Sequence, residues 1–324
     1  MREVIARAPV RIDFGGGWTD VPPYTMERGG CVCNLAIALY ARATLRACPS
    51  GVEITTDGDE ALGAAALRRG SLRGVRLNQQ SEFPRGAGLG GSSAAGVAVA
   101  AAIAAWRHEC IEPSVLAERS RALEVEELGV AGGFQDHYAA AYGGALALHF
   151  DKRTTAERIP LSDAFANAIE RQCIVAYTGE SRISGQTITA VLDAYRAGVP
   201  RVVEALARMR ALAESMIDAL ARERLDELGE LVREHWLHQR SLHEKISTPA
   251  IERLLEVALD GGALGGKALG ASGGGCVVVV APSERADEVR ARMSALARVL
   301  PFSVDRLGAH VTDGEGDEME TWQS

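Results

Sequence analysis

One glycine-rich segment, Pro84–Ala94, carries the residues best suited to chemistry, in the order PRGAGLGGSSA. Glycines allow positive φ angles and let backbone N–H groups approach a ligand closely. The alanine-rich stretch that follows predicts a helix beginning at Ser92 or Ser93, and the unpaired N–H groups and dipole at a helix start favour an anion. The two serines could bind a phosphate, contact Mg²⁺ or cap the helix. We interpret the segment as a phosphate-binding loop.

Three other motif patterns match the sequence but fail on their context. Gly86–Gly91 fits a dinucleotide fingerprint, yet no strand ending in an acidic residue follows about twenty residues later. Asp13–Gly15 spells the magnesium motif of protein kinases, but it precedes the glycine loop and the sequence has no His-Arg-Asp. Gly261–Lys267 resembles a P-loop in which Ala268 replaces the required Ser or Thr. These interpretations are set aside.

The surrounding pattern predicts an α+β protein of two domains, 1–150 and 151–324. The first half is rich in β-type runs, and residues 200–260 show the spacing of three amphipathic helices. Residues 313–324 form an acidic tail that we expect to be solvated. The expected strands of the first half are Val4–Phe14, Cys31–Leu39, Ala41–Ala47 and Val52–Thr56.

The charge balance and the cysteines exclude several classes of protein. A formal net charge of −8 argues against nucleic acid as a partner, because its binding depends on basic groups. The uncharged run Gly86–Trp106 is built mainly of small residues and carries turn glycines, so it is not a membrane span. The six scattered cysteines fit buried free thiols. The first residues lead directly into a strand, and we expect a cytoplasmic protein.

Three segments in this order resemble the GHMP small-molecule kinases: Ala8–Asp20, Pro84–Ala94 and Lys267–Cys276. Gly132–Tyr138 and Tyr177–Arg182 are similar to the sugar-1-kinase branch, above all to the D-glycero-D-manno-heptose 7-phosphate kinases. The resemblance implies a two-domain GHMP-kinase fold with the active site in the groove between the domains. It also implies ATP as co-substrate, Mg²⁺, and transfer of a phosphoryl group to the anomeric hydroxyl of a sugar. The product would be a sugar 1-phosphate.

The same resemblance assigns the reacting groups. Asp136 matches the catalytic aspartate that accepts the proton of the attacking hydroxyl, an effect of roughly 10²–10⁴ in rate. Arg11 matches the basic residue that offsets the charge of the transferring phosphoryl group. Ser92 and Glu124 match the Mg²⁺ ligands, with Glu126 and Glu127 as alternatives to Glu124. The nucleotide phosphates would contact Arg85, Gly86, Ala87, Gly88, Leu89, Gly90, Gly91, Ser92 and Ser93.

The sugar would contact a second set of residues: Gly17, Thr19, Asp20, His137, Arg182, Gly273 and Gly274. Asp20, with Thr19, corresponds to the family's sugar-hydroxyl contact. Gly17 stands where galactokinase has an acidic residue, and its loss would make room for a phosphorylated sugar. Arg182 and Arg85 are candidates for the distal phosphate, because an acidic protein needs local positive groups to hold anionic substrates.

The identity of the substrate stays open at this point. Gly16–Pro23 resembles the fucokinase branch more closely, and Trp18 could stack on an unphosphorylated sugar. L-Fucose or another free sugar is therefore an alternative substrate. An alternative of another class is a catalytically silent sugar and nucleotide sensor on the same fold, although Arg11, Ser92 and Asp136 are intact. The sequence leaves the anomer and the oligomeric state undetermined.

Overall fold

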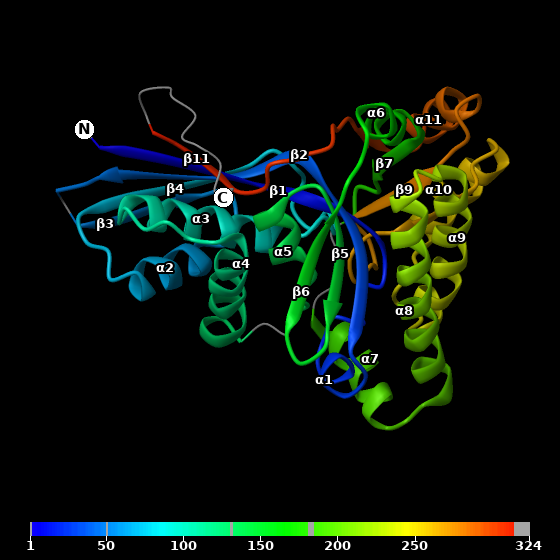
Figure 1. Ribbon diagram of the computed structural model, residues 1–324, viewed down its shortest axis with the longest axis horizontal. Helices are drawn as coiled ribbons and strands as arrows, with labels where there is room; N and C mark the ends of the chain where they lie inside the picture. The colour runs from blue at the N-terminus through cyan, green and yellow to red at the C-terminus, as the bar shows by residue number, and fades with distance from the viewer. Residues whose placement is uncertain (1, 50, 130–131, 181–184, 314–324) are drawn as a thin grey trace.

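The computed structural model describes residues 2–49, 51–129, 132–180 and 185–313. Figure 1 shows a β-rich half built around a large sheet and a second half dominated by long helices. The large sheet has seven strands and the smaller one has four. The mixed architecture agrees with the predicted α+β class.

The seven-stranded sheet is organised around two long strands, β1 (Glu3–Gly15) and β2 (Gly30–Ala47). They pair antiparallel along most of their length, and β2 merges the two shorter strands expected there. The first part of β2 pairs with β5 and its last part with β4, so the sheet branches. The remaining strands are β3 (Val52–Thr56), β4 (Val75–Ser81), β5 (Ala145–Phe150), β6 (Thr154–Ile159) and β11 (His310–Asp313).

The burial pattern of β1 shows how the sheet lies in the molecule. Burial alternates at its beginning and becomes continuous from Ala8 onward. α3 (Gly91–Trp106) and α8 (Pro200–Ala221) both contact β1 and β2, so this end of the sheet meets both halves of the chain. The end of β1 is therefore fixed by core packing, which suits a segment that carries site residues.

The helix after the glycine loop begins at Gly91, slightly before the predicted start. Its N-cap is Gly90 with φ of 79°, and no side chain caps it. Neither Ser92 nor Ser93 therefore serves as the N-cap. Small residues let α3 approach β1 and β2 closely. The other helices of this half are α1 (Tyr24–Arg28), α2 (Glu60–Arg69), α4 (Pro113–Ala122), the π-helical turn η1 (Leu123–Glu127) and α5 (Gln135–Tyr142).

The smaller sheet is antiparallel and carries the helices of the second half. Its strands run in the order β10 (Arg298–Leu300), β7 (Cys173–Tyr177), β9 (Cys276–Val280) and β8 (Gly265–Ala268). The three amphipathic helices predicted within 200–260 are confirmed as α8, α9 (Leu225–Ser241) and α10 (Pro249–Asp260). The remaining helices are α6 (Asp163–Gln172), α7 (Gly185–Arg196) and α11 (Ala286–Ser294).

The large sheet contains strands from both sides of the expected domain boundary. The position 150/151 lies between β5 and β6, which pair with each other in the large sheet. β11, close to the end of the described chain, returns to pair with β1. Of the acidic tail predicted for 313–324, only Asp313 is described, as the last residue of β11. Within the described ranges, no helix combines the length and apolar character that crossing a bilayer requires.

Candidate active site

A pocket of about 110 Å³, open to solvent at its mouth, lies where the two halves meet. Its walls come from the end of β1 and the turn after it, the start of α3, the start of α5, and Gly270–Ala271 from the second half. Segments separated by more than 250 residues thus meet at one place. The glycine loop and Asp136 both line this pocket, as the sequence-based interpretation required.

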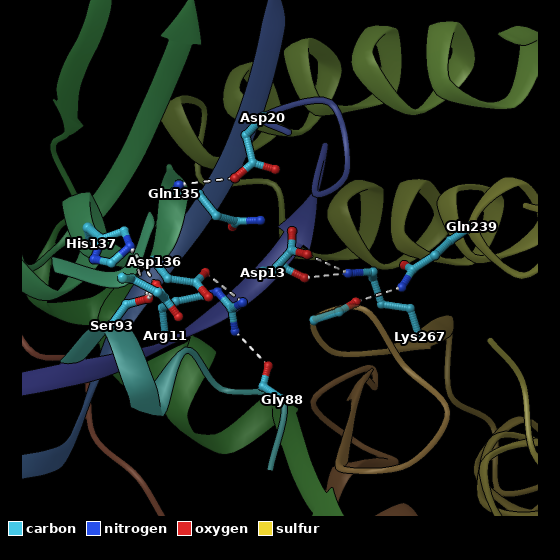
Figure 2. A network of polar contacts seen from close by, with 12 residues as sticks. Arg11, Asp13, Asp20, Gly88, Ser93, Gln135, Asp136, His137, Gln239 and Lys267 are labelled. Carbon is cyan, nitrogen blue, oxygen red and sulfur yellow. Dashed lines mark hydrogen bonds and ion pairs between the residues drawn. The ribbon is translucent and has the colours of Figure 1, made fainter. Parts of the chain in front are cut away.

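Arg11 and Asp136 form an ion pair in the pocket. Nη2 of Arg11 lies 2.7 Å from Oδ1 of Asp136, and Nη1 donates to the backbone carbonyl of Gly88 at 2.7 Å (Figure 2). Arg11 is 2% exposed, whereas the Asp136 side chain keeps 20% exposure. The guanidinium is therefore held on both sides, and the carboxylate stays accessible to a ligand.

The glycine loop reaches Asp136 because two of its residues lack a side chain. A Cβ on Gly90 would lie 3.0 Å from Cγ of Asp136, and one on Gly88 would lie 2.6 Å from the carbonyl of Leu269. Both glycines have positive φ angles, 79° and 73°. The loop also lines a second hollow on its other side, between Gly58 and Ala95. The backbone can therefore contact a ligand that extends from the pocket over the start of α3.

Ser92 and Glu124 both line the pocket, whereas the alternative acids do not. Ser92 is exposed at the first turn of α3, and Glu124 projects from η1. Glu126 and Glu127 instead face Arg69, at 2.9 and 3.7 Å from its Nη1. Oxygen donors of this kind suit Mg²⁺, which protein sites hold with one or two carboxylates together with substrate phosphates and water. Among the described residues no cluster of three or more His, Cys, Asp or Glu side chains could hold a metal.

His137 is buried behind Glu124 and outside the pocket. Its Nε2 lies 3.0 Å from Oε2 of Glu124, and its Nδ1 lies 2.9 Å from Oγ of Ser120. The Ser93 hydroxyl completes this group at 3.4 Å from both Glu124 and His137. His137 was predicted as a substrate contact. The sequence was equally compatible with a residue that supports the site from behind, and the 1% exposure of His137 and its contact with Glu124 fit that role.

Asp20 and Asp13 bring two further carboxylates to the pocket. Oδ2 of Asp20 accepts the backbone N–H of Gln135 at 3.1 Å. Burial raises the pKa of Asp20 to about 7, and the nearby carboxylates Asp136 and Asp13 add to the increase. Burial also acts to raise the pKa of Asp13, but the charges of Lys267 and Arg11 outweigh it and lower the pKa overall.

Gly17 lines the pocket next to the carboxylate of Asp13. A Cβ at Gly17 would lie 2.4 Å from Oδ2 of Asp13 and 3.0 Å from Nε2 of Gln135. The glycine therefore makes room for the neighbouring carboxylate of Asp13. The Asp13 carboxylate thus keeps negative charge beside Gly17. The expected room for a phosphorylated sugar had assumed that this charge was absent.

Two buried residues of the second half hold the end of β1 and the turn that follows. Nζ of Lys267 donates to the backbone carbonyl of Asp13 at 2.7 Å and lies 3.2 Å from its Oδ2. Nε2 of His235 accepts the N–H of Gly16 at 2.9 Å. Burial lowers the pKa of His235 to about 3, so its ring is neutral and can accept this bond.

Several predicted substrate residues lie away from the pocket wall. The buried hydroxyl of Thr19 donates to the carbonyl of Gly16 at 2.6 Å and shapes the turn. Gly273 and Gly274 are buried outside the pocket, which is lined by Gly270 and Ala271 instead. Arg85 is exposed and donates to the carbonyl of Gly58 at the second hollow. Arg182 lies outside the described residues.

Other residues that line the pocket were not assigned to the site from sequence. Asp13 and Gln135 line the pocket and lie within Ala8–Asp20 and Gly132–Tyr138, two segments that resemble the family. Their position in these segments was the sequence feature that could have indicated them. Ile188, on α7, gave no local signal. Trp18, which the sequence offered as a stacking surface for an unphosphorylated sugar, lines the pocket but is only 6% exposed and packs in a cluster with Tyr24 and Trp236. Little of its ring is therefore available for stacking on a sugar.

Two family models match the chain. The model described as GHMP kinases N terminal domain matches residues 37–144, and the one described as GHMP kinases C terminal matches residues 216–298. The two matched regions supply the glycine loop, Glu124 and Asp136 from the first, and His235 and Lys267 from the second. The matched regions also include the wall residues Gly90–Ser93 and Gly270–Ala271, whereas the wall residues of β1 and the turn after it precede the first match.

Individual relatives are similar over nearly the whole chain. D-glycero-alpha-D-manno-heptose 7-phosphate kinase of Campylobacter jejuni is 26% identical, over 95% of this chain and 98% of its own length. Bifunctional fucokinase/GDP-fucose pyrophosphorylase of Arabidopsis thaliana is 26% identical over 90% of this chain, which spans about a third (31%) of that protein. A D-glycero-D-manno-heptose 1-phosphate kinase of Bacteroides thetaiotaomicron superposes with a TM-score of 0.77 at 25% identity, covering 95% of this chain and 98% of its own.

Proposed function

The chain belongs to the GHMP kinases, ATP-dependent phosphotransferases that act on hydroxyl groups, and from that premise we propose that it phosphorylates the anomeric hydroxyl of a sugar. The first candidate substrate is D-glycero-D-manno-heptose 7-phosphate. The relative with this activity in its name matches along its full length. The product would be the 1,7-bisphosphate.

The observation that carries the proposal is the Arg11–Asp136 pair beside the glycine loop. Asp136 is accessible from the pocket and lies against Gly90 of the loop, so a hydroxyl bound in the pocket beside them can lose its proton to the carboxylate. Arg11 lies on the same side and can offset charge on the transferring group. The backbone N–H groups at the start of α3 would bind the nucleotide phosphates.

Ser92 and Glu124 are the residues that would hold Mg²⁺ in this arrangement. Both offer oxygen donors to the pocket, and a bound Mg²⁺ would neutralise phosphate charge during transfer. His137 and Ser93 would keep the Glu124 carboxylate in place through their contacts with it. This role explains why a histidine is buried next to Asp136.

An uncharged sugar such as L-fucose is the second candidate, and the charge of the pocket favours it. Asp13, Asp20, Glu124 and Asp136 are all part of the wall. Within the described residues, Arg11 is the one basic side chain of the wall, and it is already paired with Asp136. A distal phosphate would need a cation from elsewhere, whereas hydroxyl groups can bond to carboxylates directly.

The test is to measure ATP consumption with L-fucose and with heptose 7-phosphate in parallel. Phosphorus NMR of the product then shows which hydroxyl carries the new phosphate. Formation of a 1-phosphate from either sugar supports the proposal and selects the substrate. Binding of ATP and sugar without turnover would refute it in favour of the sensor.

A further inference from the structure

Two buried oxygen atoms in the pocket wall lack a partner. Oδ1 of Asp13 and Oε1 of Gln135 have no hydrogen-bond partner among the described residues. The two residues are only 1% and 5% exposed, and both line the pocket. A buried acceptor without a partner costs about 1–3 kcal/mol, so two of them in one wall point to a ligand that supplies the missing donors.

The surroundings of Asp13 fix which of its oxygens is available. Nζ of Lys267 donates to the backbone carbonyl of Asp13 and to its Oδ2. The remaining oxygen, Oδ1, points toward the side on which Asp20 and Gln135 lie (Figure 2). The contact with Gly17 leaves the carboxylate little freedom to rotate, because it lies against that backbone. The orientation is therefore preset before any ligand binds.

The protonation state makes Asp13 an acceptor only. The net lowering of its pKa by Lys267 and Arg11, against the effect of burial, keeps this carboxylate ionised near neutral pH. An ionised carboxylate has no proton to donate, and Oε1 of Gln135 is likewise an acceptor. The pair therefore requires two donors from the ligand, and a polyol is the class of small molecule that provides neighbouring O–H donors.

We infer that Asp13 and Gln135 accept hydrogen bonds from two hydroxyl groups of the acceptor sugar and require that part of the sugar to be uncharged. The inference rests on the proposed function and names two specificity residues for it. A phosphate group at the same place would be repelled by the carboxylate of Asp13, with Asp20 close by. Its oxygens are acceptors and could not donate hydrogen bonds to Asp13 or Gln135. Any phosphate carried by the substrate must then lie away from the Gly17 turn.

The experiment is calorimetric titration of the full chain with L-fucose and with heptose 7-phosphate, without nucleotide. Asp13→Asn would turn its amide oxygen toward Lys267 and present an N–H₂ donor to the sugar. We expect its sugar affinity to fall roughly 10- to 100-fold, the range for a hydrogen bond to a charged group. Gln135→Met removes the other acceptor with little change in length, and we expect a loss of about fivefold.

Gln79→Met is the matched control. Gln79 is also buried with an unpartnered Oε1, but it lies on β4 away from this pocket. It should leave sugar affinity unchanged, and ATP affinity should be unchanged in all three variants. Monodeoxy analogues of the sugar that binds add a second check. The analogue that lacks the hydroxyl bound by Asp13 should bind weakly to the parent protein. Its affinity should fall little further when Asp13 is replaced by Asn.

The outcomes separate this inference from the proposed function. Unchanged sugar affinity in Asp13→Asn and Gln135→Met, or an equal loss in Gln79→Met, would overturn the inference even if turnover is intact. If the parent protein binds sugar without phosphorylating it and Asp13→Asn weakens that binding, the proposed function fails and the sugar contacts stand.

Discussion

Lys267 and Asp13 form a buried ion pair across 254 positions of sequence, with Nζ 3.2 Å from Oδ2 and 2.7 Å from the backbone carbonyl. Lys267 lies on β8 of the smaller sheet and Asp13 on β1 of the larger one. Both side chains are almost completely buried. The pair therefore ties the second half of the chain to the strand that leads into the Gly17 turn of the pocket wall.

Replacing Lys267 by Met leaves the Asp13 carboxylate buried without its partner. We expect the free energy of unfolding to fall by about 3–5 kcal/mol, measured by urea denaturation. The double variant Lys267→Met, Asp13→Asn should lose less than the sum of the two single variants, because the unpaired charge is gone. Lys245→Met, at an exposed lysine, is the control and should change stability by less than about 0.5 kcal/mol. Strict additivity in the double variant would contradict a direct coupling.

Replacing Asp136 by Asn removes the proposed proton acceptor while keeping its size. We expect kcat to fall by roughly 10²–10⁴ with little change in the KM for ATP, because the contribution is made in the transition state. Steady-state kinetics with the sugar identified as substrate gives both parameters. Asp193→Asn changes an exposed aspartate on α7 and should have no effect. A kcat within threefold of the parent would remove Asp136 as the base.

Replacing Glu124 by Gln weakens the oxygen donor proposed for Mg²⁺. We expect the Mg²⁺ concentration that gives half-maximal activity to rise by about tenfold or more, since a carboxylate is lost from a hard-cation site. Glu126→Gln is the matched control, two positions after Glu124 on the same turn, and Glu126 pairs with Arg69 outside the pocket. The assignment of Glu124 is wrong if both variants respond to Mg²⁺ as the parent does.

Asp20 should make stability depend on pH in a defined window. Burial raises its folded-state pKa from 3.8 to about 7, so the folded protein binds more protons at Asp20 than the unfolded chain does. Its contribution to stability is complete below about pH 4 and is lost as the pH rises toward 7, with an upper limit on the order of 4 kcal/mol. Asp20→Asn should remove this loss. Thermal unfolding at pH 5 and pH 8 measures the difference between the two proteins, and parallel pH profiles would refute the raised pKa.

The sequence alone was sufficient for the local chemistry of the glycine loop. Glycines at positions 86, 88 and 90, followed by an alanine-rich run, dictate a turn with positive φ angles and a helix start, because no other residue adopts that backbone as readily. The three helices of 200–260 were predictable for a similar reason, since their apolar residues repeat at the helical period. Such features depend on neighbours within a few residues.

Tertiary structure decided which polar residues share the pocket. Glu124 could not be distinguished from Glu126 by spacing, because the π-helical turn that carries them sets which side chain faces inward. His137 and Thr19 proved to be buried supports, and Asp13 proved to be part of the wall. The partner of Asp13 is a lysine 254 positions away, and pairing at that distance follows from the packing of two sheets. No local pattern of residue types contains that information.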